Sequence, residues 1–151
     1  MVAIVAACIP QAQPEPSSEM SRENTLVLAD SQPDTLDPAI SYTSLSHQYV
    51  AQIFSGLVRL DEGLRVVPDL AERWEVLDRG TRYIFHLRPD ARFHDGRSVT
   101  AQDVAFSLER AADPDTGSRT ASTYLGDIVG VNAKLEGEAQ SISGLRILDD
   151  S

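Results

Sequence analysis

The sequence predicts an α+β fold, in which helices and antiparallel hairpins follow one another along the chain. Apolar residues recur at helical spacing after Ser44 and again after Thr100. Between these two stretches, short runs of alternating apolar residues are separated by turn-forming residues, as in hairpins. The chain has 151 residues, which is the length of one ordinary domain with a core of its own.

Composition excludes two classes of function. Thirteen basic residues against 23 acidic ones give a formal charge of -10, and the positive residues do not cluster, so no nucleic-acid partner is expected. No apolar run approaches the ~20 residues that cross a bilayer. The single cysteine, Cys8, cannot form an internal disulfide.

The first 23 residues differ in composition from the rest. Val5-Ala6-Ala7-Cys8 resembles a bacterial lipobox, which implies that Cys8 is lipidated and anchors the protein to a membrane. Only seven residues, none of them basic, precede Cys8, so we interpret residues 1–8 as a truncated lipoprotein signal whose start lies upstream. Residues 9–23 are rich in proline and polar residues and are expected to be a flexible tether. The alternative is that Cys8 is an ordinary residue near an extended terminus.

A folded region is expected over residues 24–151. It begins with a buried strand at residues 25–29, followed by a polar loop and a turn at residues 35–38, where Pro38 keeps Asp37 out of helical geometry. A helix follows from Ser44 to near Gly56, because apolar residues recur every four positions. Its apolar stripe comprises Leu45, Tyr49, Ile53 and Leu57, and its candidate N-caps are Ser41, Thr43 and Ser44.

Two hairpins and a second helix are expected next. The first hairpin pairs residues 57–60 with 64–67, and the second pairs strands on either side of residues 78–80. Thr100 caps the helix, with Asp103 three residues on, and Asp113-Pro114 ends it. Residues 142–148 predict one more strand.

No motif in the chain indicates catalysis or a cofactor. There is neither a glycine-rich phosphate loop nor a G-x-S-x-G nucleophile turn. The three histidines, His47, His86 and His94, lack the spacing of metal ligands, so neither a metal nor a cofactor is expected.

Three stretches carry a resemblance to a known family: residues 67–76, 80–96 and 99–110, supported by residues 35–38 and 54–57. Together they resemble the extracytoplasmic solute-binding proteins of bacterial peptide/nickel-type ABC importers, solute-binding protein family 5. The resemblance covers residues 24–148. It implies that the chain is an incomplete first lobe of a two-lobed, type II periplasmic-binding-protein fold, with Trp74, Tyr83, Phe85 and Phe93 in its core.

The implied function is capture of an oligopeptide or a related small solute outside the cytoplasm and its delivery to ABC permease subunits. Two lobes would close over the solute, with no covalent step. The loop after the first strand faces the cleft in this family, so Ser31, Gln32 and Pro33 are candidate solute contacts, with Tyr124 as a second candidate. Both segments could instead be ordinary surface loops. A hydrolase using carboxylate pairs, or a sensing module built from the same lobes, stays as an alternative.

Overall fold

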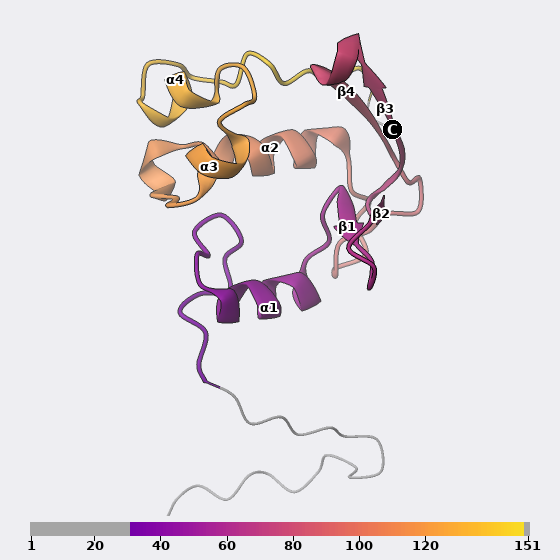
Figure 1. Cartoon of the computed structure of the whole chain (residues 1–151), viewed down its shortest axis with the longest axis vertical. Coiled ribbons are helices and arrows are strands. Elements are labelled where there is room, and N and C mark those ends of the chain that lie inside the picture. The colour runs from indigo at the N-terminus through magenta and orange to yellow at the C-terminus, as the bar shows by residue number, and fades with distance from the viewer. Residues whose placement is uncertain (1–30, 150–151) are drawn as a thin grey trace, which may run out of the picture. The chain divides into compact units, whose positions relative to one another are not determined.

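A computed structural model of the chain describes residues 31–149. Cys8, the tether at residues 9–23 and the predicted strand at residues 25–29 lie outside the described residues. In chain order, the elements are α1 (Ser44–Ile53), β1 (Val58–Leu60), β2 (Val66–Pro68), β3 (Ala71–Leu77), η2 (Asp78–Gly80), β4 (Arg82–Leu87), α2 (Ala101–Ala111), η3 (Pro114–Thr116), α3 (Ala121–Leu125) and α4 (Val131–Leu135) (Figure 1). Helices and antiparallel strands in one chain confirm the α+β class.

Helix α1 begins where the sequence predicts. Of the three candidate caps, Thr43 is the N-cap, and its hydroxyl accepts a hydrogen bond from the Ser46 amide at 3.2 Å. The helix ends at Ile53, because Phe54 is already extended, and the chain then runs into β1. Leu57 therefore lies beyond the helix, and extending the apolar stripe that far was wrong.

Both predicted hairpins are present as separate two-stranded antiparallel sheets in the described part of the chain. At the turn between β1 and β2, the Asp61 carboxylate accepts hydrogen bonds from the amides of Gly63 and Arg65 at 2.8 and 2.9 Å. The turn between β3 and β4 has left-handed backbone at Asp78, Arg79 and Gly80. This hand of turn matches the right-handed twist of paired strands, which explains why the hairpin closes over so few residues.

The aromatic residues that were expected in the core lie on the β3–β4 hairpin and just after it. Trp74 lies opposite Phe85, and the Tyr83 and Phe85 rings stack with centroids 6.4 Å apart. Trp74 is half-buried, but Tyr83 is 54% exposed and Phe85 and Phe93 are each 37% exposed. The core prediction was therefore wrong for these three residues, because the described part of the chain leaves about half of Tyr83 and more than a third of Phe85 and Phe93 uncovered.

Helix α2 has the predicted N-terminus. The Thr100 hydroxyl accepts from the Asp103 amide at 3.3 Å, and the Asp103 carboxylate accepts from the Thr100 amide at 2.9 Å. The helix ends at Ala111, just before the predicted stop, and Asp113 then caps η3.

The segment after Gly117 forms the short helices α3 and α4, which sequence reasoning did not anticipate, and the predicted strand at residues 142–148 is wrong. Ile142 packs instead into a small core with Ala112 and Val131. Its neighbours lie so close to Gly130 that a β-carbon there would approach the Ser143 backbone nitrogen to 2.6 Å. The two sheets of the described range pair only β1 with β2 and β3 with β4, so residues 142–148 are not part of a ladder.

Two further properties concern residues 31–149. No helix among them is both long and apolar enough to cross a membrane. Their His, Cys, Asp and Glu side chains form no group of three or more that could hold a metal ion.

Candidate functional site

The candidate site is the segment that leads into α1, together with the part of α2 that it faces. Ser31 and Gln32 are exposed and Pro33 is half-buried. These three predicted contact residues come directly before two carboxylates, Asp34 and Asp37. The two carboxylates fix the segment in different ways.

Asp34 ties the segment to the start of α1. Its carboxylate accepts hydrogen bonds from the hydroxyls of Thr43 and Ser46. The Ser46 hydroxyl oxygen also accepts from the Thr35 amide at 3.3 Å, and Ser46 is fully buried. Because both hydroxyls stabilise the ionised form, first Ser46 and then Thr43, the pKa of Asp34 lies below its ordinary value.

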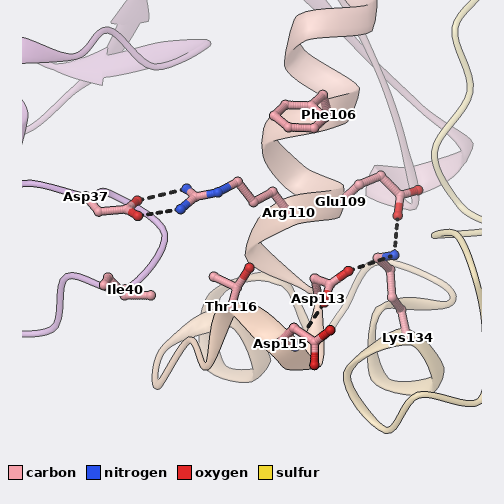
Figure 2. Close-up of a pocket in the computed structure, with 9 residues that line it drawn as sticks. All are labelled: Asp37, Ile40, Phe106, Glu109, Arg110, Asp113, Asp115, Thr116 and Lys134. Carbon is pink, nitrogen blue, oxygen red and sulfur yellow. Dashed lines mark hydrogen bonds and ion pairs between the residues drawn. The ribbon is translucent and has the colours of Figure 1, made fainter.

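Asp37 ties the same segment to helix α2. One carboxylate oxygen accepts from Nη1 of Arg110 at 2.9 Å, and the other accepts from Nη2 (Figure 2). The first oxygen also accepts from the Ala39 amide at 3.0 Å. The Arg110 guanidinium is the main cause that holds the pKa of Asp37 below its ordinary value, while partial burial opposes the shift. A two-pronged arginine–carboxylate contact fixes orientation as well as distance.

An open pocket of about 580 Å³ lies beside this ion pair. Figure 2 shows Asp37 and Ile40 on one side of α2, with Arg110 extending toward Asp37, and Glu109 and Lys134 on the other side of the helix. None of the predicted contact residues, Ser31, Gln32, Pro33 and Tyr124, belongs to its lining. The lining residues are Asp37, Ile40, Phe106, Glu109, Arg110, Asp113, Asp115, Thr116 and Lys134.

Both cations of the pocket are already matched by carboxylates. Lys134 is only 7% exposed, and its ammonium lies 3.2 Å from Glu109 Oε2 and 3.9 Å from Asp113. It also donates to the Gln140 carbonyl at 3.0 Å, while Glu109 Oε1 accepts from the Ile142 amide at 2.8 Å. Lys134 therefore holds α4 and the segment after it against α2. In the pocket wall both cations are thus paired with carboxylates.

The second predicted contact segment lies in α3. Tyr124 is 72% exposed, so its ring and hydroxyl are accessible from solvent. Just before α3, the guanidinium of Arg119 lies 4.5 Å from the ring centroid of Tyr42, which immediately precedes the cap of α1. The Tyr42–Arg119 stack thus connects the segment just before α1 with the segment just before α3.

Sequence reasoning missed the residues that hold this site together. It assigned Asp37 to a turn but gave it no partner, because Arg110 lies 73 residues further on. The contact of Asp34 with α1 had a local signal: a carboxylate shortly before a cluster of Ser and Thr residues at a helix start. The Tyr42–Arg119 stack had none.

A family model described as bacterial extracellular solute-binding proteins, family 5 Middle, matches residues 65–150. The probable deoxycholate-binding periplasmic protein YgiS of Escherichia coli is 39% identical over 150 residues, which are 97% of this chain and 27% of that protein. The periplasmic oligopeptide-binding protein OppA of the same organism is 41% identical over 101 residues, or 65% of this chain and 18% of that protein.

The fold is also similar to solved structures. The crystal structure of Haemophilus influenzae OppA in complex with RPPGFSPFR matches with a TM-score of 0.73 and 30% identity, over 78% of this chain and 23% of that one. The chain thus spans about a quarter or less of the length of these three proteins.

Proposed function

Because the chain belongs to the bacterial extracellular solute-binding proteins of family 5, we propose that it is part of the substrate-binding component of an ABC importer. The match over residues 65–150 carries this proposal. The solved relatives are two-lobed periplasmic binding proteins, and the predicted fold class is confirmed at that level, with this chain covering one part. The complete protein would capture its solute outside the cytoplasm and hand it to the permease.

The proposed mechanism is a shift in population between open and closed forms. Solute that contacts both lobes stabilises the closed form in proportion to its extra affinity for that form. In this chain, Ser31, Gln32 and Pro33 would offer polar and backbone groups, and Tyr124 would lay its ring against the solute. Their exposure supports this assignment, since each of the two segments can be reached from solvent.

Two solute classes are drawn from the relatives. The similarity to the oligopeptide-binding protein OppA of Escherichia coli favours a peptide, and the Haemophilus influenzae OppA structure contains the nonapeptide RPPGFSPFR. A bile acid is favoured by YgiS, a probable deoxycholate-binding protein similar over nearly the whole chain. Both solutes carry a carboxylate and also contain apolar groups. We propose a peptide as the solute, and deoxycholate is the second solute to be tested for binding.

Location and anchoring follow from the same proposal. The relatives are periplasmic proteins, which supports a site outside the cytoplasm. Lipidation at Cys8 would hold the complete protein at the membrane next to its permease, with residues 9–23 as the tether. The alternative functions are those of a hydrolase and of a sensing module built from the same lobes. Members of this family are binding proteins, so the family match favours neither alternative.

Calorimetry with the complete polypeptide tests the proposal. We expect binding of RPPGFSPFR, with Gln32→Ala and Tyr124→Ala each weakening it about tenfold, or ~1.4 kcal/mol. The melting temperature should stay unchanged, because both side chains are exposed. Gln102→Ala, an exposed residue of α2 away from both segments, is the matched control. If neither the peptide nor deoxycholate binds, the proposed function is wrong for these solutes. Turnover of the peptide would favour the hydrolase.

A further inference from the structure

Two arginines from one stretch of the chain reach back to the same short segment. Arg110 lies in the last turn of α2, and Arg119 lies nine residues later, before α3. Arg110 binds the carboxylate of Asp37 with both terminal nitrogens. Arg119 lies over the ring of Tyr42, with its central carbon 4.5 Å from the ring centroid. Asp37 and Tyr42 are the two ends of one segment, residues 37–42.

This segment is braced internally. The Asp37 amide donates to the Thr35 hydroxyl at 3.0 Å, and the Ser41 amide donates to the Asp37 carbonyl at 3.0 Å. Asp34 adds the contacts with Thr43 and Ser46 at the start of α1. Residues 34–46 therefore form a turn with fixed internal geometry. The direction in which Ser31, Gln32 and Pro33 leave it depends on how this turn sits on α2.

We infer that Arg110 and Arg119 are positioning residues that set the turn against α2 and α3 and so align the two solute-contacting segments. This inference rests on the proposed function, since it supposes that residues 31–33 and Tyr124 contact the solute. Neither arginine needs to contact the solute itself. Arg110 fixes the segment at Asp37, and Arg119 fixes it at Tyr42, next to the segment that carries Tyr124.

Both contacts are exposed to solvent, so their loss should change the position of the turn much more than the stability of the domain. The side chains of Arg110 and Asp37 are 42% and 29% exposed, and Tyr42 is 47% exposed. Ion pairs this close to solvent add little to the stability of a whole domain. Their loss should therefore loosen the turn and leave the fold intact.

The experiment uses the complete polypeptide with Arg110→Gln, Arg119→Gln and the double variant. Arg82→Gln is the control, because its ion pair with Asp78 at 3.1 Å also lies at the surface, with side chains 61% and 62% exposed, but is located at the β3–β4 turn. Hydrogen exchange is followed at the amides of Asp37 and Ala39, and affinity is measured calorimetrically with RPPGFSPFR and with deoxycholate. We expect exchange at these amides about tenfold faster, and affinity about tenfold weaker, in the double variant, with a melting temperature like that of Arg82→Gln.

Conservative variants provide the second readout. Tyr42→Phe keeps the ring under Arg119 and should bind like the parent, whereas Tyr42→Leu should resemble Arg119→Gln. Asp37→Arg combined with Arg110→Asp should recover much of the affinity that either change alone removes. The inference is wrong if the double arginine variant shows unchanged hydrogen exchange. It is also wrong if exchange is faster but the variant keeps full affinity for the probe that the parent binds. A parent that binds neither probe instead overturns the proposed function, and the exchange rates still decide whether the arginines hold the turn.

Discussion

Replacing Lys134 with methionine tests the packing of α4 against α2. Lys134 is 7% exposed, and its ammonium is matched by Glu109 at 3.2 Å and by the Gln140 carbonyl at 3.0 Å. Methionine is similar in length but cannot donate, so the Glu109 carboxylate loses its counterion in a partly dry site. The carboxylate keeps one contact, the Ile142 amide at 2.8 Å.

The expected cost follows from this geometry. Breaking a buried ion pair by removing one partner costs about 3–5 kcal/mol. The Glu109 side chain as a whole is 25% exposed, but Oε2, the oxygen that faces Lys134, is buried, so water does not replace the lost ammonium and the range of about 3–5 kcal/mol applies. Adding Glu109→Gln removes the stranded charge while its amide oxygen can still accept from Ile142. The double variant should therefore lie only about 1–1.5 kcal/mol below the parent.

Urea unfolding of the complete polypeptide measures both values, followed by a signal from the lobe that contains this chain. Arg65→Met is the matched control, because it removes a close ion pair, to Asp61 at 2.8 Å, from a side chain that is 81% exposed. That control should cost less than about 1 kcal/mol. If Lys134→Met costs no more than the control, Lys134 is solvated and the described packing of α4 is wrong.

The remaining predictions concern the anchor, a helix cap and pH. Cys8→Ser should abolish incorporation of labelled palmitate when the complete polypeptide is expressed in a bacterial host; equal labelling of both proteins would exclude lipidation at Cys8. Thr100→Ala should cost ~1 kcal/mol in thermal unfolding, because the Asp103 amide loses its acceptor at the α2 cap, whereas Ser107→Ala on the same helix should cost less. The pKa of Asp37 is depressed in the folded state, chiefly by Arg110, so its contribution to stability is present above the unfolded value of about 3.9 and is lost as pH falls through the lower folded value. Because this ion pair is close to solvent, the contribution is small: Asp37→Asn should slightly reduce the fall in melting temperature of the parent below about pH 4, and parallel pH profiles of parent and variant would contradict this.

Local signals in the sequence account for most of the elements. The Thr100–Asp103 capping box and the turn at residues 78–80 were predictable because their determinants lie within a few residues of each other. The short helices α3 and α4 were not, because five-residue helices carry too little periodicity. Residues 142–148 have the composition of a strand, yet Ile142 is fixed by Glu109, 33 residues earlier, and by the core. That contact leaves no trace in local sequence.

In the candidate site, too, features with local determinants were predictable from the sequence and features fixed by distant contacts were not. Ser31, Gln32, Pro33 and Tyr124 came from the family resemblance, and their roles stay predictions. Of the two carboxylates that hold this segment, the role of Asp34 was predictable, since Asp34 precedes a Ser/Thr-rich helix start. The arginines could not be identified, because the chain has twelve, and nothing local separates Arg110 and Arg119 from those at the hairpin turns.

The bracing of residues 34–46 bears on how a surface loop can bind with useful affinity. Ordering the backbone of a free residue costs about 1–2 kcal/mol, so a loop that orders only upon binding loses much of its contact energy. Here Asp34 is held by two hydroxyls of the α1 start, and Asp37 by the guanidinium of Arg110. Both contacts exist without a solute, and so the entropy of this turn is already lost on folding. If the adjoining residues contact the solute, this prior ordering strengthens binding without adding a single contact to the solute itself.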